Sequence, residues 1–342
     1  MSDSTDNPAT TPPADDDLAA VERLKDAYQK LRAEMGKVIV GQHAVLEELL
    51  LAVFARGHCL LIGVPGLAKT LMIHTLSDAL DLTYNRIQFT PDLMPSDITG
   101  TEVIQEDKAT GLRQFKFLRG PVFANVVLAD EINRAPPRTQ AALLEAMQEH
   151  AVTAAGVTMR LPEPFFVLAT QNPIEQEGTC PLPEAQVDRF MPKLRVGYPS
   201  REEEKEIMRR MASGEPIPIR HVASPETILE ARHRIADLYM DERIVDYIVD
   251  IVHATRVPSD FGLTELTPLV EFGASPRATI ALAQASRAHA FLRGRSFVTP
   301  DDVKAIAPDV LRHRVLTSYE AEAEEVTSDD VVAKVLGKIE SP

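Results

Sequence analysis

Short apolar segments alternate with amphipathic ones through the first 200 residues of the chain. Mainly apolar runs lie at residues 58–62, 86–89, 125–129, 165–170 and 193–196. Segments in which apolar residues recur with a helical period lie at residues 18–35, 41–56 and 70–80. Short strands that are apolar on both faces and alternate with helices are typical of a parallel sheet. We therefore predict an α/β domain in which a five-stranded parallel sheet lies between helices.

Two further segments alternate polar and apolar residues around a turn and predict β-hairpins. The first covers residues 99–119 and turns near Thr110-Gly111, and the second covers residues 151–161. Both interrupt the alternation of helices and strands. We therefore expect two inserted hairpins in the sheet domain.

The strand pattern stops near residue 199, and a helical half follows. Ser224, Ser275 and Thr299 each precede a proline, which is the combination expected at the N-cap and the first residue of a helix. Asp241 is the expected N-cap of a fourth helix. These starts predict an all-α C-terminal domain.

The chain is thus divided into three parts. Residues 1–17 are rich in Ser, Thr, Asp and Pro and contain no Lys or Arg, so we expect a disordered acidic tail rather than a signal or transit peptide. Residues 18–199 form the α/β core, and residues 200–342 form a helical lid domain. Within the lid, the acidic stretch 320–325 is expected to be a solvated connector to a last helix near 329–338.

Composition and charge narrow the classes of partner. The net charge of −15 disfavours a general attraction to nucleic acid or to an anionic membrane. The absence of Trp disfavours a surface on which nucleic-acid bases stack. No apolar run approaches the roughly 18 residues of a membrane span. The only cysteines, Cys59 and Cys180, lack metal-ligand spacing, so we expect a protein of the reducing cytoplasm. Cys180 lies in a Gly/Pro-rich loop, where both a reactive and an inert thiol are open alternatives.

Residues 63–70 carry the clearest functional pattern. They follow an apolar strand, precede a helix and end in Lys-Thr, as in a P-loop, whose backbone N–H groups wrap nucleotide phosphates. Lys69 can reach the β- and γ-phosphates, and the Thr70 hydroxyl can hold Mg²⁺. Ala68 stands where the pattern has its second glycine, and we expect φ to stay negative there because the residue has a Cβ. The nucleotide-binding residues predicted here are Gly63, Val64, Pro65, Gly66, Leu67, Ala68, Lys69, Thr70 and Leu71. The alternative is a Gly/Pro turn followed by Lys-Thr by chance.

Two later strands end in polar residues. Asp130 can hold the hydration shell of Mg²⁺ opposite Thr70, and Glu131 can polarise a water for attack on the γ-phosphate. Asn172 ends the next strand, and carboxyl ends of parallel strands meet at one edge, so we expect it beside the γ-phosphate. Plain strand ends, and Asn-Pro as a turn initiator, are the alternatives.

Two arginines stand out by position. Arg189 lies just before the fifth strand, where it is either a solvated surface residue or an arginine finger that reaches a neighbour's nucleotide. Arg277 is the second residue of a predicted helix, where a cation opposes the helix dipole by about 0.3–1 kcal/mol. A bound anion would offset that penalty, so we expect Arg277 to sense a phosphate.

Together these segments resemble the MoxR family of AAA+ ATPases from about residue 20 to residue 335. The most specific are Asp-Glu-Ile-Asn-Arg-Ala-Pro at 130–136 and Gln-Asn-Pro-Ile-Glu-Gln-Glu-Gly at 171–178. Further matches are Val-Gly-Gln at 40–42, Leu-Pro-Glu-Ala-Gln-Val-Asp-Arg-Phe at 182–190 and Ala-Ser-Pro-Arg-Ala at 274–278. Cys180 departs from the aromatic residue expected after Gly178-Thr179, whereas Ala68 fits the family's own loop.

The resemblance implies an AAA+ P-loop NTPase core with inserted hairpins and a helical lid, and a role for each matched residue. Lys69 and Thr70 take the Walker A roles, and Asp130 and Glu131 take the Walker B roles. Asn172 is implied as sensor 1, Arg189 as an arginine finger acting in trans, and Arg277 as sensor 2 supplied by the lid to an ATP between core and lid. Gly41 and Gln42 match the segment near the adenine.

The resemblance also implies partners. It implies a homo-oligomeric ring, with six subunits as the expected number, that hydrolyses Mg-ATP to remodel a protein client or insert a metal cofactor, often with a partner carrying a von Willebrand factor A domain. A nucleic-acid motor is one alternative, because the first hairpin holds Arg113, Lys116 and Arg119, although their spacing puts them on alternating faces. A scaffold that binds ATP without hydrolysing it is the other.

Overall fold

The computed structural model describes residues 15–106, 113–154, 156–173, 179–212, 215 and 217–342. The N-terminal tail predicted at residues 1–17 lies outside this range up to residue 14. Residues 15–17 belong to helix α1 (Asp15–Val38) rather than to the tail, so the expectation of disorder was wrong for these three residues. No helix among the described residues is long and apolar enough to cross a membrane.

A five-stranded, all-parallel sheet with the order β2-β5-β8-β1-β9 forms the centre of the core, as predicted. Its central strands are buried on both faces, which explains their continuous apolar runs. The strands are β1 (Cys59–Ile62), β2 (Tyr84–Gln88), β5 (Val126–Asp130), β8 (Phe166–Gln171) and β9 (Lys193–Arg195).

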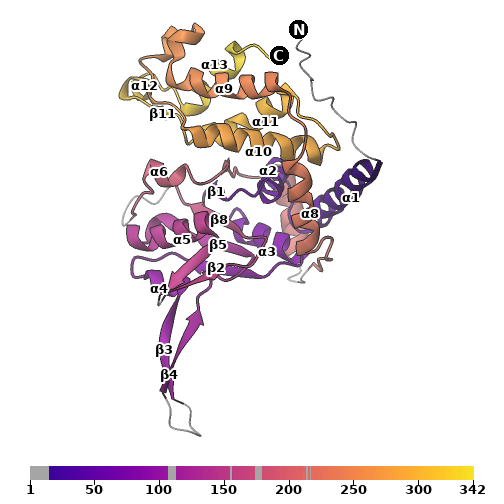
Figure 1. The fold of residues 1–342 in the computed structure, drawn as a ribbon, viewed down its shortest axis with the longest axis vertical. Coiled ribbons are helices and arrows are strands. Elements are labelled where there is room, and N and C mark those ends of the chain that lie inside the picture. Colours follow the sequence, from indigo (N-terminus) through magenta and orange to yellow (C-terminus); the bar gives the residue numbers. More distant parts are fainter. Residues whose placement is uncertain (1–14, 107–112, 155, 174–178, 213–214, 216) are drawn as a thin grey trace, which may run out of the picture.

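Helices cover both faces of this sheet (Figure 1). Alternate residues of β5 point to opposite faces: Val126 and Leu128 join one apolar cluster, and Val127 and Ala129 join the other. The first cluster includes side chains of α1, α2 (His43–Phe54) and α3 (Lys69–Ala79), and the second includes those of α5 (Pro137–Glu149). This double burial fixes the strand register, so the strand ends that carry the polar residues stay aligned.

Both predicted hairpins are present. The first pairs β3 (Gly100–Glu106) with β4 (Arg113–Arg119) after the short helix α4 (Pro95–Thr99), and it projects away from the sheet domain (Figure 1). The second pairs β6 (Ala151–Ala154) with β7 (Val157–Arg160).

The C-terminal half is helical, and four of its helices, α8 to α11, begin at the predicted caps. Ser224 and Ser275 accept hydrogen bonds from the backbone of their first helical turns, and Thr299 forms a capping box with Asp302. The helices of this half are α7 (Arg201–Met211), α8 (Pro225–Ala236), α9 (Glu242–Arg256), α10 (Pro276–Leu292), α11 (Pro300–Leu311), α12 (Tyr319–Ala323) and α13 (Ser328–Lys338).

Two details of this half differ from the sequence prediction. The stretch expected to be a solvated connector overlaps helix α12, because Ala321 is buried and Ser318 caps the helix. A small antiparallel sheet also joins β10 (Val270–Phe272) to β11 (Leu316–Thr317) within the half that was expected to be all-α. The alternating pattern in such short strands is too brief to be recognised.

Helices α7 and α8 pack on the core, although they follow the boundary predicted at residue 199. Arg210 of α7 donates hydrogen bonds to the carbonyls of Gly36 and Lys37 at 2.9 and 2.8 Å, at the end of α1. Arg232 of α8 donates from Nε to the carbonyl of Val53 in α2 at 3.0 Å, and Figure 1 shows α8 lying along this side of the core. Helices α9 to α13 form the separate upper layer (Figure 1).

Candidate functional site

The loop between β1 and α3 has the conformation that its glycines allow. A Cβ on Gly63 would lie 2.9 Å from the carbonyl oxygen of Val196, so only glycine fits against the neighbouring strand. Gly66 has φ of 86°. Ala68 has φ of 55°, in the left-handed region, so the expectation of a negative φ was wrong. The physical reason is its place as the N-cap of α3, where the chain must turn sharply from the loop into the helix.

Lys69 is held by the loop itself. Its ammonium donates hydrogen bonds to the carbonyls of Gly63 and of Val64, the second at 3.3 Å. Partial burial lowers the pKa of Lys69, while the negative charges of Asp130 and Glu131 act in the opposite direction. A cation held by neutral carbonyls next to two carboxylates is available to an incoming anion.

The carboxyl end of β5 presents Asp130 in a fixed orientation. Its Oδ1 accepts a hydrogen bond from the Thr170 hydroxyl at 2.6 Å. Its Oδ2 accepts from Arg86 Nε and Nη2 at 3.1 and 2.6 Å. Because β5 lies between β2 and β8, both neighbouring strands orient this carboxylate.

Glu131 follows with φ of 56°, again left-handed for a residue with a Cβ. Its backbone N–H donates to the Thr170 hydroxyl at 2.9 Å. Its carboxylate accepts from Gln88 Nε2 at 2.8 Å and from Arg134 at 3.0 Å. Backbone strain of this kind is about 1–3 kcal/mol and persists where the surroundings fix the residue.

These groups converge on one cavity of about 440 Å³, which we call the P-loop cavity. Asn172, at the end of β8 and 5% exposed, lines it beside both carboxylates. The P-loop cavity is lined by Pro65, Gly66, Ala68, Lys69, Thr70, Leu71, Arg86, Asp130, Glu131 and Asn172. The structure therefore brings together the predicted Walker A, Walker B and sensor 1 residues, whose roles stay predictions.

A second, mostly apolar cavity of about 160 Å³ adjoins the first and shares Gly66, Ala68 and Leu71 with it. The remaining lining residues are Val38, Ile39, Val40, Gln42, Leu67, Met72, Pro199, Ile207 and Met211. An apolar slot next to a phosphate-binding loop suits a purine ring. Gln42 lines this cavity and donates from Nε2 to the carbonyl of Gly197 at 2.8 Å. Gly41 is not among its lining residues and has φ of 68°, which glycine supplies for the turn into α2.

Arg189 and Arg277 lie elsewhere. They line a third cavity of about 300 Å³, which we call the arginine cavity, and it shares no lining residue with the other two. Its further lining residues are Arg56, Gly57, His58, Met147, Gln148, Asp188, Met191, Ile280, Ala281, Gln284 and Arg314. The sequence predicted that the lid supplies Arg277 to the bound ATP. Within one chain, Arg277 does not line the P-loop cavity, so this expectation was wrong for the single chain. The reason is that the N-terminus of α10 is bound to the loop before β9, where Ser275 donates to Asp188 at 2.9 Å.

The donor set of the P-loop cavity fits a magnesium ion bound together with phosphates. Thr70 and Asp130 supply a hydroxyl and a carboxylate, which are oxygen ligands that Mg²⁺ prefers. Among the residues that the structure describes, no group of three or more His, Cys, Asp or Glu side chains is arranged to hold a metal alone. The ion would therefore depend on nucleotide phosphates and water for its remaining ligands.

Sequence reasoning missed several supporting residues. Arg86, Gln88 and Thr170 orient the two carboxylates, and they lie on the strands that flank β5. Ile207 and Met211 of α7 close the apolar cavity. The polar residues at positions 86 and 88 within an otherwise buried sheet are a signal that could have identified the first pair.

Comparisons with known proteins agree on one family. A profile of the ATPase family associated with various cellular activities (AAA) matches residues 58–192, and an AAA lid domain profile matches residues 264–335. The chain is 46% identical over 309 residues to Chaperone MoxR1 of Mycobacterium tuberculosis, covering 90% of this chain and 81% of that protein. It is 30% identical to Protein MoxR of Methylorubrum extorquens, covering 89% of this chain and 92% of that protein.

Solved structures agree with this result. The crystal structure of a candidate ATPase from Cytophaga hutchinsonii matches with a TM-score of 0.89 and 44% identity, covering 95% of this chain and 97% of that one. A full-length MCM homolog from Methanopyrus kandleri matches with a TM-score of 0.57 at 20% identity, covering 90% of this chain and 64% of that one, which is a likeness of fold alone.

Proposed function

Because this chain belongs to the MoxR family of AAA+ ATPases, we propose that it hydrolyses Mg-ATP in a ring and uses the energy to remodel a protein client. The observation that carries the proposal is the convergence of Lys69, Thr70, Asp130, Glu131 and Asn172 on one cavity beside an apolar slot. Phosphate, magnesium, water and purine each have a suitable set of side chains there.

Each group has a distinct part in hydrolysis. Lys69 exchanges its bonds to the loop carbonyls for bonds to the β- and γ-phosphates, where its charge stabilises the transition state. Thr70 and Asp130 would hold Mg²⁺, largely through water, and the ion would neutralise the phosphate charge. Glu131 accepts a proton from the attacking water, and Asn172 orients that water beside the γ-phosphate.

Catalysis is completed by a second copy of the chain. The arginine cavity shares no residue with the P-loop cavity, so Arg189 and Arg277 act on the nucleotide of an adjacent subunit. Among the described residues, none accepts a hydrogen bond from Arg189 Nε, which is buried within the single chain. An arginine finger in trans typically contributes about 10³–10⁵ in rate. Six subunits are the ring size that we infer from the family.

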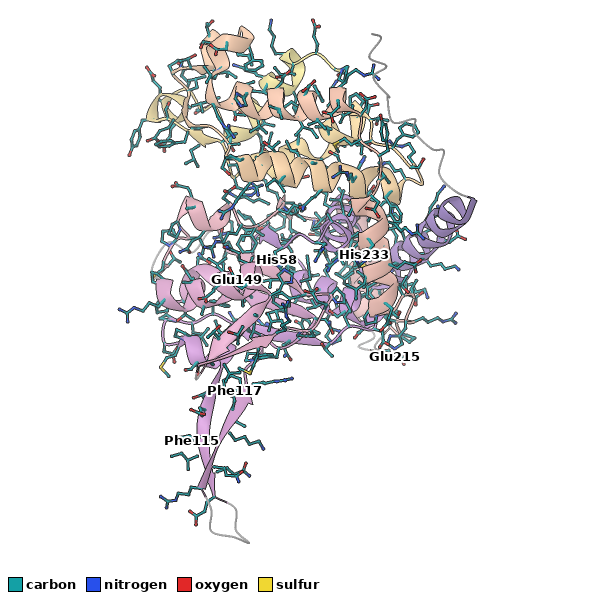
Figure 2. The ribbon with its side chains drawn as sticks, in the orientation of Figure 1. His58, Phe115, Phe117, Glu149, Glu215 and His233 are labelled. Atoms are coloured by element: carbon teal, nitrogen blue, oxygen red, sulfur yellow. The ribbon has the colours of Figure 1, made fainter. Side chains whose placement is uncertain are left out.

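The β3–β4 hairpin is the element best placed to contact a client. Its cross-strand partners Ile104 and Phe115 are 62% and 71% exposed, and Figure 2 shows Phe115 on the hairpin, away from the sheet domain, with Phe117 nearer the base. Exposed apolar side chains in one place mark interaction surfaces. A partner with a von Willebrand factor A domain, insertion of a metal cofactor and a cytoplasmic location are the finer parts of this proposal.

The basic residues of the hairpin do not favour a nucleic-acid motor. Arg113 pairs with Glu106 at 3.4 Å, and Arg119 lies over the ring of Phe123 at 5.2 Å. The strand register places Lys116 on the face opposite to both arginines.

The substitution Glu131→Gln tests the proposal. It preserves the shape of the side chain and its contact with Gln88, but it removes the carboxylate that accepts the proton. We expect ATP to bind as in the wild type, measured with a fluorescent analogue, while phosphate release stops. Normal turnover in this variant would show that Glu131 is not the general base. Loss of ATP binding would show instead that Glu131 maintains the structure of the cavity.

A further inference from the structure

Asp188 is the point at which the loop before β9 meets the lid. Its Oδ2 accepts a hydrogen bond from Ser275 at 2.9 Å and lies 3.5 Å from Nη1 of Arg277. Its Oδ1 accepts from Arg314 Nε at 2.7 Å. One carboxylate thus holds the N-cap of α10, the arginine that follows it, and an arginine beyond the end of α11.

Arg314 fixes the backbone of the same loop. Its Nη2 donates to the carbonyls of Asp188 and Phe190 at 2.9 and 2.8 Å, and its Nη1 donates to that of Met191 at 2.9 Å. The neighbouring His313 donates from Nε2 to the carbonyl of Phe190 at 3.0 Å. These bonds bracket Arg189 on both sides along the chain.

Burial makes this arrangement rigid on one side and open on the other. The side chains of Arg314 and Asp188 are 2% and 14% exposed, so their charge-assisted bonds are poorly screened by solvent. The side chain of Arg277 is 50% exposed and lines the arginine cavity. The buried pair therefore acts as an anchor, and the exposed arginine is the part that can reach outward.

We propose that Asp188 and Arg314 are positioning residues that hold Arg189 and Arg277 in one fixed arrangement, so that both reach the nucleotide of an adjacent copy together. This inference rests on the proposed function, because it assumes that these two arginines act in trans. Separating the lid from the loop would break the bonds of Asp188 and Arg314 at the same time. The lid of one subunit and its arginine finger therefore move as a unit.

Mixed rings test this inference. A Glu131→Gln subunit cannot hydrolyse ATP but presents intact arginines to its neighbour. An Asp188→Asn subunit has an intact P-loop cavity but a disturbed arginine pair, since the amide keeps the size of the carboxylate and loses its charge. In rings made only of Asp188→Asn subunits, we expect the fluorescent ATP analogue to bind as in the wild type. We expect ATP turnover in these rings to be about 10–100-fold slower.

Addition of Glu131→Gln should then raise the turnover per Asp188→Asn subunit, and addition of Arg189→Ala should not. Arg314→Lys is the second variant and should behave in the same way. Lysine keeps the positive charge near Asp188, but its ammonium cannot reproduce the planar geometry with which the guanidinium donates to three carbonyls. Arg293→Gln is the matched control: it breaks a 2.8 Å ion pair with Glu47 between lid and core, away from the arginine cavity, and should leave turnover unchanged.

The possible outcomes separate the two levels of the proposal. If Glu131→Gln rescues Arg189→Ala but not Asp188→Asn or Arg314→Lys, the arginines act in trans and the positioning role is wrong. If Glu131→Gln rescues none of the three, catalysis is not shared between subunits, and the proposed ring mechanism is overturned with it. Weakened nucleotide binding by Asp188→Asn alone would also overturn the inference, because it would show that Asp188 supports the P-loop cavity of its own subunit.

Discussion

The P-loop cavity and the arginine cavity are built in opposite ways. The first is formed by turns at the ends of parallel strands, and Ala68 and Glu131 both hold left-handed backbone conformations beside it. The second is formed by helix ends and a loop that are joined by buried ion pairs such as Arg314 with Asp188. A strained backbone and a lysine held only by neutral carbonyls suit a site that must accept a ligand. Side chains held by a buried ion pair suit a site that must present fixed groups to another molecule.

The largest expected effect is that of Arg189→Ala, which separates the two cavities by function. Turnover should fall by about 10³–10⁵ if this residue is an arginine finger. Binding of ATP to the P-loop cavity should not change, because Arg189 does not line it. Phosphate release and equilibrium binding measured on the same preparation check the two halves of this expectation. A parallel loss of binding would mean that the cavities are not independent.

Lys69→Met changes the P-loop cavity and leaves the arginine cavity intact. The substitution removes the cation that faces the phosphates and keeps most of the apolar stem. We expect ATP affinity to fall by about 10–100-fold, the value of one or two charge-assisted hydrogen bonds. Titration with the fluorescent analogue measures this loss. In mixed rings, the variant should still activate wild-type neighbours, since its arginine cavity is intact; failure to do so would show that the two cavities communicate.

Thr170→Val tests how far the carboxylates depend on their neighbours. Valine is close in shape but cannot donate to Asp130 or accept from the N–H of Glu131. We expect about 1–3 kcal/mol of lost stability from the unsatisfied N–H, together with slower turnover. Denaturant unfolding and phosphate release measure the two effects. Unchanged stability would indicate that water replaces the hydroxyl.

The smallest expected effect is that of Ala68→Gly. Removal of the Cβ relieves the left-handed strain at φ of 55°, so the variant should be more stable by about 1 kcal/mol and its Tm should rise. Ala141→Gly is the control, since this exposed alanine lies within α5 and its replacement should be destabilising by about 0.5–1 kcal/mol. Equal changes in both variants would contradict the assignment of strain to Ala68.

The sequence allowed prediction of the sheet and of most of the P-loop cavity, because both follow from local order. Apolar runs such as 125–129 and 165–170 can be buried only within a sheet that is covered on both faces. Parallel strands then bring Asp130 and Asn172 to one edge without further information. The predicted positions of the strands and of the helix caps in the lid were confirmed for the same reason.

Features that depend on tertiary contacts could not be predicted. The place of Arg277 is set by the contact between Ser275 and Asp188, which lie far apart in the chain. The left-handed φ of Ala68 is set by its place as the N-cap of α3, where the chain turns from the loop into the helix, and not by the preference of alanine. Nothing in the local pattern around His313 and Arg314 indicates that these two residues are buried against carbonyls of the core.

The projecting hairpin has a mechanical consequence. Seven residues of strand span about 23 Å at roughly 3.3 Å per residue, and β3 leaves the sheet domain at one end only. If a subunit rotates by about 15° when its nucleotide is hydrolysed, a rigid arm of that length carries its far end through about 6 Å. The hairpin then acts as a lever. A change of a few ångströms at the phosphates moves the far end of the hairpin, together with any polypeptide bound to it.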